Sequence, residues 1–458
     1  MNGAFFGDML QSISDRGRKL LDRTWSRRPD AVSRSADFVV LCEHLLSGRG
    51  EASGVALARE ILGRYANLTT GPRMAFFEAL AQRFGPDRER MEKAIAAWQA
   101  NPNDATAAEL HLAAEPRRQE LFRRLNLAPG GTAALVRMRE QLLDAMAHRP
   151  DFKVVDADFV HLFSSWFNRG FLVLRSIDWA TPANILEKLI KHEAVHKIRS
   201  WDDLRRRIDP SDRCCFAFFH PALNDEPLIF VEVALTDAIP GAIAPILAAK
   251  RETLEADKVD TATFYSISNC QRGLAGVSFG NFLIKQVVEE ISRDNSRLKT
   301  FVTLSPVPGF ASWLKRERAA DSSKALTQED RDALAGLDTE GWWQVPEKRQ
   351  PMEEALMRAA AWYFLYAKNS RGFPADPVAR FHLGNGARLE RIHFLGDGSE
   401  NGIRQSYGVM VNYLYDLDDI EKNHEAFAEN RVVVAANAIR KMARPGPTGD
   451  LVALPQKA

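Results

Sequence analysis

The sequence is poor in cysteine, nearly neutral in net charge and free of long apolar runs. Only four cysteines occur in 458 residues and none forms a CxxC pair, which excludes a disulfide framework and favours a reducing compartment. The formal net charge is +1, so no global charge attracts nucleic acid or an anionic membrane. No stretch approaches the ~20 apolar residues of a membrane span. The cysteines are Cys42, Cys214, Cys215 and Cys270.

Neither end of the sequence carries a recognisable targeting signal. Residues 1–21 include Asp8, Asp15 and Arg16, and this charge is too high for a secretory signal. The last three residues, Gln-Lys-Ala, differ from the peroxisomal tripeptide Ser-Lys-Leu. We therefore expect a cytoplasmic protein with no nucleic-acid partner and no membrane partner.

The first 150 residues have the spacing of a helical bundle. Apolar residues recur at intervals of three and four, and glycine- and proline-containing breakers separate the periodic segments. Short connections between helices favour antiparallel packing. The sequence predicts helices over residues 54–66, 73–84, 88–100 and 133–147.

Beyond about residue 160, helical segments alternate with strand-like apolar runs. Thr181 and Pro182 predict the start of a helix that continues to residue 198. The mixture predicts an α+β protein, with a helical bundle over residues 1–160 and an α/β catalytic domain over residues 161–458. Strands are expected at 214–219, 228–235, 263–268, 300–304 and 407–415, and further helices at 281–293, 352–368 and 420–442.

The first of three local motifs is His192-Glu193-Ala194-Val195-His196, a match to HExxH. On a helix the two histidines would share one face and could bind zinc, with Glu193 as the base of a hydrolase. Lys191 and Lys197 flank the motif and oppose cation binding, and no third ligand stands out downstream. We interpret the motif as a solvated helix face and keep a zinc hydrolase as an alternative.

The second motif, Gly276-Val277-Ser278-Phe279-Gly280, matches the GxSxG pattern of serine hydrolases. That pattern requires a strand that runs straight into the serine, whereas residues 269–275 separate this motif from the expected strand. Gly273, Gly276 and Gly280 instead suit a loop whose N–H groups face a pyrophosphate at the start of a helix. A glycine turn without a ligand also explains the pattern.

The third motif runs from Thr303 to Phe310 and reads Thr-Leu-Ser-Pro-Val-Pro-Gly-Phe. Pro306 biases Ser305 toward an extended backbone, and the Pro-Gly pair that follows turns the chain. A hydroxyl at a strand end on a stiff loop is well placed for chemistry. Ser-Pro is also common in turns without any catalytic role, so this motif alone does not identify a catalytic serine.

Taken together, several blocks of sequence resemble the malonyl-CoA decarboxylase family. They follow the family's order over about residues 200–415, and none of them is a generic motif. The blocks are Phe264–Ser268, Gln271–Lys285, Leu304–Phe310, Phe381–Leu383, Asn385–Ala387, Arg391–Ile392, Gly402–Ile403 and Met410–Tyr415.

This resemblance implies conversion of malonyl-CoA to acetyl-CoA and CO2, a step of fatty acid metabolism, without a metal or other cofactor. It implies a helical domain that supports a homo-oligomer, expected to be a tetramer, and a catalytic domain similar to N-acetyltransferases (GNAT-type). The family's serine and histidine fall on Ser305 and His382, and Asn412 and Tyr415 lie in a block lining the same pocket. The coenzyme A loop falls on Ala275, Gly276, Val277, Ser278, Phe279, Gly280 and Asn281. Some family members carry a glutamate at the position of Ser278.

The implied reaction sets the chemistry that these residues would perform. Loss of CO2 leaves an enolate, so the site must stabilise an oxyanion and deliver a proton to carbon. We hypothesise that His382 donates this proton, since imidazole titrates near neutral pH, and that Ser305 hydrogen-bonds the carboxylate or thioester oxygen. His220 and His393 rank lower because neither falls on a family catalytic position. An acyl-CoA-dependent acyltransferase is the other alternative.

Overall fold

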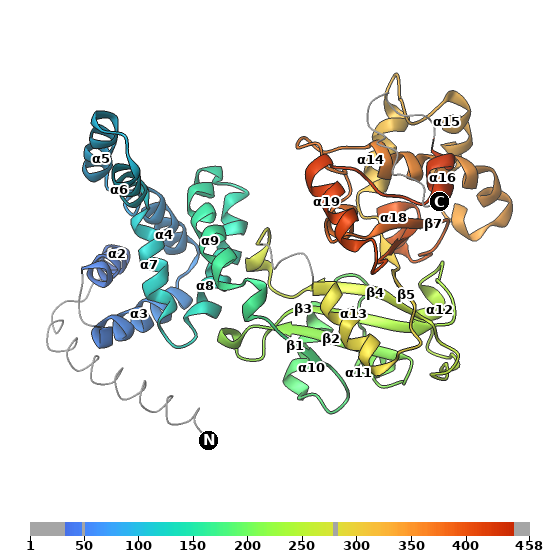
Figure 1. Ribbon diagram of the computed structural model, residues 1–458, viewed down its shortest axis with the longest axis horizontal. Helices are drawn as coiled ribbons and strands as arrows, with labels where there is room; N and C mark the ends of the chain where they lie inside the picture. Colours follow the sequence, from blue (N-terminus) through green and yellow to red (C-terminus); the bar gives the residue numbers. More distant parts are fainter. Residues whose placement is uncertain (1–32, 48–50, 278–282, 444–458) are drawn as a thin grey trace. The chain divides into compact units, whose positions relative to one another are not determined.

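The computed structural model describes residues 33–47, 51–277 and 283–443 (Figure 1). The chain divides into two compact units, and it passes between them more than once. None of the helices in the described ranges is long and apolar enough to cross a membrane. Unit 1 comprises Met1–Leu172, His220–Glu226 and Gln271–Phe279; unit 2 comprises Val173–Phe219, Pro227–Cys270 and Gly280–Ala458.

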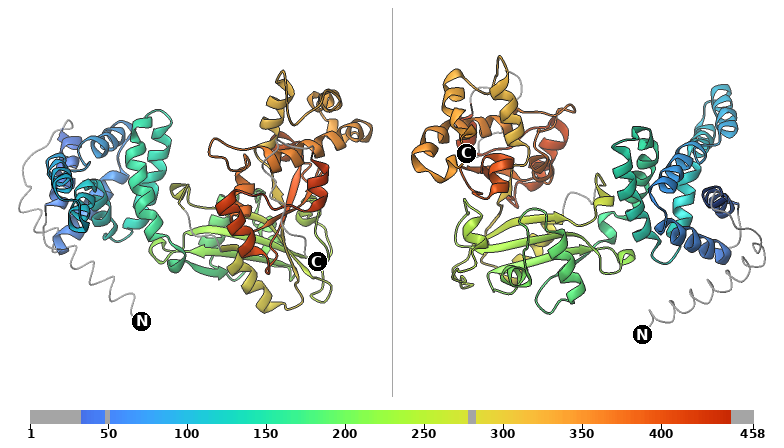
Figure 2. Two further views of the ribbon diagram at one scale, coloured as in Figure 1. Left: turned by 45° about the horizontal axis from the view of Figure 1, so that its top comes forward. Right: turned by 180° about the vertical axis from the view of Figure 1, so that it is seen from behind.

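Unit 1 is a bundle of helices, as the periodicity predicted. Capping side chains start several of them: Asp87 accepts the N–H of Arg90 in α5, and Asn103 forms a capping box with Thr106 in α6. The helices α5 and α6 run side by side as a hairpin, which Figures 1 and 2 both show. The helices of unit 1 are α2 Ser33–Leu46, α3 Glu51–Ala66, α4 Thr70–Gln82, α5 Arg88–Ala100, α6 Asp104–Ala114, α7 Arg117–Asn126, α8 Gly131–Met146 and α9 Lys153–Trp166.

Aromatic side chains fill the core of unit 1. Phe122 of α7 stacks on Phe159 of α9 with ring centroids 4.1 Å apart. A buried ion pair between Arg118 and Asp158 joins the same two helices. Because a buried charge is costly without its partner, this pair fixes the register of α7 against α9.

Unit 2 is built on one mixed sheet with the strand order β1-β2-β3-β4-β5-β8-β6, and β7 also pairs with β8. Strands β1 to β4 are antiparallel neighbours, β4 and β5 are parallel, and β8 runs antiparallel to β5, β6 and β7. The strands are β1 Val173–Ser176, β2 Arg213–Phe219, β3 Pro227–Thr236, β4 Thr261–Asn269, β5 Thr300–Thr303, β6 Ser305–Pro306, β7 Arg388–His393 and β8 Met410–Leu414.

Helices cover both faces of this sheet. Apolar side chains of α10 and α11, such as Leu189 and Leu204, pack against Cys215 and Ala217 on one face. Phe216 alternates with those two residues and lines a cavity with Ile291 of α13, so α13 covers the opposite face. The helices of unit 2 are α10 Ala183–His192, α11 Trp201–Ile208, α12 Ala244–Leu247, α13 Leu283–Asp294, α14 Phe310–Ala319, α15 Gln328–Leu334, α16 Pro346–Tyr366, α17 Pro377–Gly384, α18 Glu400–Ser406, α19 Ile420–Asn430 and α20 Asn437–Met442.

The α+β class is confirmed by a helical N-terminal region followed by a mixed sheet with helices. All the expected strands are present, although the last begins at Met410 because Tyr407 has a left-handed backbone with φ of 53°. The first residues of the helix expected at 281–293 lie outside the described residues, and α13 is described from Leu283.

Three helix predictions are wrong in length. The helix expected at 352–368 begins six residues earlier, at Pro346, and ends at Tyr366. The helix expected at 182–198 ends at His192, because the next residue bonds locally as described below. The helix expected at 420–442 is two helices, α19 and α20, separated by Arg431 with φ of 55°. Between them Val434 accepts the N–H of Leu389 at 2.9 Å, so this Val-rich stretch extends the sheet instead of a helix.

Candidate active site

Ser305 begins the short strand β6 immediately after the parallel ladder of β4 and β5 ends. That ladder stops at the pair Phe264 and Thr303, and Ser305 then pairs with Val411 of β8. Pro306 follows and keeps the backbone extended, as the sequence predicted. The Ser305 side chain is only 5% exposed, so its hydroxyl is held in a largely dry site.

His382 lies on α17 and meets Ser305 from the other side of the site. Its helix starts with Asp376 as N-cap and Pro377 at the first position, a favourable beginning for a helix of eight residues. The Nε2 atom of His382 lies 3.3 Å from Oγ of Ser305, and its Nδ1 atom lies 2.7 Å from the hydroxyl oxygen of Tyr415. The structure therefore brings three of the four predicted catalytic residues into one hydrogen-bonded chain.

The hydrogen-bond network selects a tautomer for His382. Ser305 donates its hydroxyl proton to Oγ1 of Thr303 at 2.9 Å, so it does not donate to the imidazole. The buried Tyr415 hydroxyl has Nδ1 as its acceptor. We assign the proton of the neutral ring to Nε2, which then donates to Ser305. In this assignment the Tyr415 hydroxyl, both ring nitrogens of His382 and the Ser305 hydroxyl each have a partner.

Asn412, the fourth predicted catalytic residue, has other partners. Its side-chain amide donates to the carbonyl oxygens of Thr303 at 2.8 Å and Pro240 at 3.2 Å, and its Oδ1 faces Nε2 of His393. Asn412 is fully buried, and these contacts fix the main chain of Thr303 beside Ser305. Its geometry suits holding the strand that carries the serine.

Burial controls the charge of the site. Removal from water lowers the pKa of His382 to about 3, because no carboxylate offsets the lost hydration. The ring of Tyr413 stacks on His382 with centroids 4.6 Å apart, which adds to the apolar surroundings. Without a bound anion His382 is neutral at physiological pH, which the sequence alone did not indicate.

The predicted coenzyme A loop is described in part. Ala275, Gly276 and Val277 are described, whereas Ser278, Phe279, Gly280 and Asn281 lie outside the described residues. Gly276 has φ of +76°, and no atom of the described residues lies within 4 Å of a Cβ built there, so its backbone conformation itself calls for glycine.

Gly273, the first glycine of this loop, has a packing role. A Cβ at Gly273 would lie 2.0 Å from the carbonyl oxygen of Val136 on α8. Arg139 of the same helix donates to the carbonyl oxygen of Gly273 at 2.8 Å. The absence of a side chain at Gly273 therefore lets the backbone of this segment lie close to α8. This packing role differs from the phosphate-binding role that the sequence suggested.

The HExxH motif forms a loop anchor, so the interpretation as a solvated helix face is wrong. Glu193 has left the helix, is 7% exposed and accepts from the N–H groups of Val195 and His196 at 2.8 and 2.6 Å. Its carboxylate also accepts from the hydroxyls of Ser266 and Ser268 on β4. These four donors stop the helix, because they satisfy Glu193 only in the turned conformation.

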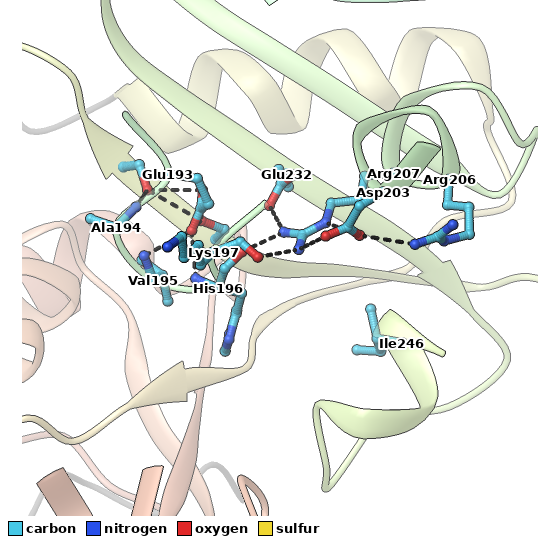
Figure 3. Close-up of polar contacts among 12 residues, drawn as sticks. Glu193, Ala194, Val195, His196, Lys197, Asp203, Arg206, Arg207, Glu232 and Ile246 are labelled. Carbon is cyan, nitrogen blue, oxygen red and sulfur yellow. Dashed lines mark hydrogen bonds and ion pairs between the residues drawn. The ribbon is translucent and has the colours of Figure 1, made fainter. Parts of the chain in front are cut away.

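The zinc alternative fails on the same geometry. His192 ends α10 and His196 lies beyond the turn, so the two histidines do not share a helix face. Within the described ranges no group of three or more His, Cys, Asp or Glu side chains is placed to hold a metal ion. Arg207 also donates to the carbonyl oxygen of His196 at 2.7 Å and pairs with Glu232 at 3.2 Å, so the loop is held by a buried cation (Figure 3).

Three residues of the site were not singled out from the sequence. Thr303 accepts from Ser305, Tyr413 supports the His382 ring, and Asp376 caps its helix. Alternation in strands offered a signal for two of them, since Thr303 lies two residues before Ser305 and Tyr413 two before Tyr415. The Asp-Pro pair at 376–377 is a helix-start signal that was not used.

Comparisons with known proteins agree on one family. Models described as the malonyl-CoA decarboxylase N-terminal and C-terminal domains match residues 84–167 and 170–451. The crystal structure of malonyl-CoA decarboxylase from Rhodopseudomonas palustris is 58% identical with a TM-score of 0.87, and the match covers 90% of this chain and 100% of that one. The crystal structure of malonyl-CoA decarboxylase from Agrobacterium vitis is 56% identical with a TM-score of 0.85, and the match covers 89% of this chain and 99% of that one.

A vertebrate relative extends the match. The protein named "Malonyl-CoA decarboxylase, mitochondrial" from Anser anser anser is 35% identical over 474 residues, covering 93% of this chain and 89% of the relative. The matched family is one of carboxy-lyases, so the protein is an enzyme of that class. The chain belongs to the malonyl-CoA decarboxylase family.

Proposed function

We propose that the enzyme decarboxylates malonyl-CoA to acetyl-CoA, with Ser305 and His382 as its acid–base pair. The observation that carries the proposal is the buried chain from Tyr415 through His382 to Ser305, in which both ring nitrogens are hydrogen-bonded. Family membership supports the substrate, since the relatives named above are malonyl-CoA decarboxylases.

The reaction consumes one proton, and the site must supply it. The bond between C2 and the carboxyl carbon breaks, its electron pair moves onto C2 and the thioester oxygen, and CO2 leaves without charge. The enolate then takes one proton at C2. A buried site favours this step because the substrate carboxylate loses its hydration while CO2 has little to lose. Ser305 and His382, 5% and 3% exposed, provide such surroundings.

His382 acquires its proton only with the substrate bound. Burial keeps the free imidazole neutral, and the negative carboxylate of malonyl-CoA raises its pKa when it binds beside the ring. The protonated ring then delivers its Nε2 proton to C2, and the Ser305 hydroxyl turns from Thr303 to donate to the developing enolate oxygen. Tyr415 holds Nδ1 throughout, which keeps Nε2 directed at the reacting carbon.

Coenzyme A recognition falls to the loop 275–281 in this proposal. Gly276 turns the chain before α13, where backbone N–H groups can bind a pyrophosphate as in the N-acetyltransferase-like arrangement expected from the sequence. Arg272 pairs with Asp144, and Lys285 lies 3.6 Å from Glu421, so each of these candidate phosphate ligands has an acidic neighbour. The enzyme needs no cofactor besides its thioester substrate.

We also propose roles for the two domains, a compartment and a metabolic context. The helical domain at 1–160 assembles a homo-oligomer, taken to be a tetramer, and the domain at 161–458 performs catalysis. The enzyme acts in the cytoplasm, in fatty acid metabolism, without nucleic-acid or membrane partners. Cys42, Cys214, Cys215 and Cys270 all lie within the described residues and form no disulfide there, which suits a reducing compartment.

A single assay tests the function. Purified enzyme is mixed with malonyl-CoA and no acceptor, and CO2 and acetyl-CoA are measured together. Equal amounts of both products support decarboxylation, whereas turnover only after an amine is added would identify an acyltransferase. The His382→Asn variant should lose at least about a hundredfold in kcat. Near-normal turnover in that variant would contradict the proposed role of the histidine.

A further inference from the structure

Asp376 is a buried carboxylate that the proposed chemistry does not use. It is 1% exposed and directly precedes α17, the helix that carries His382. Its Oδ1 accepts the N–H of Ala379 at 2.8 Å and so caps the helix. Its Oδ2 is buried and accepts no hydrogen bond from the described residues. A buried carboxylate oxygen in this state is costly and calls for a reason.

The second oxygen of Asp376 faces the loop that follows Ser305. Gly309 ends that loop at the start of α14, and a Cβ at Gly309 would lie 3.9 Å from Oδ2 and 2.7 Å from the Tyr363 hydroxyl oxygen. The N–H groups of Gly309 and Val378 act on the carboxyl group to lower its pKa, although neither completes a hydrogen bond to Oδ2, and the N–H of Ala379 donates to Oδ1. Asp376 therefore faces donors from both segments that carry the reacting pair.

We propose that Asp376 is a positioning residue for the decarboxylation, holding the Ser305 loop and the His382 helix at the separation that the reacting pair needs. The inference rests on the proposed function and extends it to the group that sets this geometry. The 3.3 Å between Oγ of Ser305 and Nε2 of His382 is at the long limit of a hydrogen bond, so a small shift of either segment would break it.

Three backbone N–H groups and the charge of Arg380 favour the ionised form of Asp376. The titratable and charged groups that face it are Arg380 on its own helix, Tyr363 on α16 and Tyr413 on β8, with Arg316 of α14 facing Tyr363. Burial opposes ionisation and raises the pKa of Asp376 to about 6. Protonation turns one acceptor oxygen into a donor that meets other donors. The alignment of the pair should therefore weaken as the pH falls through about 6.

The variant Asp376→Asn separates the two roles of the side chain. Its oxygen can still accept the N–H of Ala379 and cap α17, but its NH2 group meets the N–H of Gly309 as donor against donor. At about pH 8 we expect kcat to fall at least about tenfold with the KM for malonyl-CoA nearly unchanged, because the interaction is needed in the transition state. The acid limb of kcat near pH 6 should disappear.

Asp330→Asn is the matched control. Asp330 is also 1% exposed, takes part in the capping box of α15 and pairs with Arg358 at 2.8 Å, but it belongs to neither segment of the reacting pair. Its variant should keep the acid limb. The phosphates of coenzyme A titrate in the same range, but they do so equally in all three enzymes. The difference between the curves therefore reports on Asp376 alone.

Stability distinguishes positioning from mere support. Because the folded protein disfavours the charge on Asp376, the neutral asparagine should raise the unfolding temperature at about pH 8 by a few degrees, with little effect at about pH 4.5. The expected result is a more stable and slower enzyme. Loss of stability together with activity would mean that Asp376 only supports the local fold, and the inference would be wrong.

A second variant keeps the test decisive if Asp376→Asn does not fold. Tyr363→Phe removes a hydroxyl that interacts with the carboxylate and should move the acid limb to higher pH, whereas an unmoved limb would overturn the inference. A different result would contradict the proposed function itself: the wild-type enzyme would release no CO2 from malonyl-CoA at any pH. An active wild type whose acid limb persists in Asp376→Asn contradicts the inference alone.

Discussion

Deletion of the Tyr415 hydroxyl tests the assigned hydrogen-bond chain most directly. In Tyr415→Phe the buried Nδ1 of His382 loses its donor, since the 2.7 Å contact to Tyr415 is the only bond described for that atom. An unsatisfied buried polar atom costs about 1–3 kcal/mol. The ring also loses the group that selects its tautomer, so Nε2 no longer reliably carries the proton toward Ser305.

The magnitude follows from this loss. If most of the cost falls on the transition state, about 1–3 kcal/mol corresponds to a drop of roughly 5- to 150-fold in kcat. The KM should change little, because Tyr415 is 3% exposed and contacts the imidazole, not the solvent side of the site. Steady-state release of acetyl-CoA measures kcat and KM, and thermal unfolding measures the remaining loss as lowered stability.

Tyr413→Phe is the control with the same chemical change. The Tyr413 hydroxyl is buried and has no hydrogen-bond partner within the described ranges, and its ring stacks on His382 at 4.6 Å. Removal of an unpaired buried hydroxyl should leave kcat within about twofold and stability equal or higher. Equal losses in the two variants would refute the reasoning, because packing alone would then explain both.

Three further predictions concern the Glu193 turn, two glycines and the pH dependence of stability. Glu193→Ala should lower the free energy of unfolding by about 3 kcal/mol, because the buried donors that now bond to the carboxylate would lose their acceptor. Urea unfolding measures this loss, and a chelator added to the wild type should not reproduce it if the motif binds no metal. Gly273→Ala should prevent soluble folding because its Cβ would meet the Val136 carbonyl at 2.0 Å, whereas Gly276→Ala should cost only about 1 kcal/mol and raise the KM. Burial lowers the pKa of His382 from 6.5 to about 3, so the unfolded chain binds a proton in this window that the folded chain does not. Stability should therefore fall by about 2 kcal/mol between pH 7 and 5, and His382→Asn should remove that slope.

Periodicity predicted the fold well where one face of an element is buried. The helix at Arg88–Ala100 and the strands β2 to β5 were expected within two residues of their bounds, because alternation and helical spacing report burial directly. The failures lie where a side chain redirects the backbone. Glu193 ended a helix that has no glycine or proline to mark the end, and its partners Ser266 and Ser268 lie more than 70 residues away.

The candidate site shows the same division. Family resemblance pointed to Ser305 and His382, but the two are 77 residues apart, and only the fold shows that β6 and α17 bring them within 3.3 Å. Local sequence offered Ser278 and the HExxH pair as more conspicuous choices. The protonation state of His382 could not be predicted, because it depends on full burial by residues from several separate segments.

The segment Gln271–Phe279 has a consequence for any attempt to dissect the enzyme. It follows β4 of unit 2 along the chain, yet it packs with unit 1, where Gly273 lies against α8 and Arg139 holds its carbonyl. A fragment starting at residue 161 would keep Ser305 and His382 but would lack α8. On the proposed function, in which the loop 275–281 recognises coenzyme A, such a fragment should retain the reacting pair and bind coenzyme A poorly, because the segment just before that loop would lose its packing against α8.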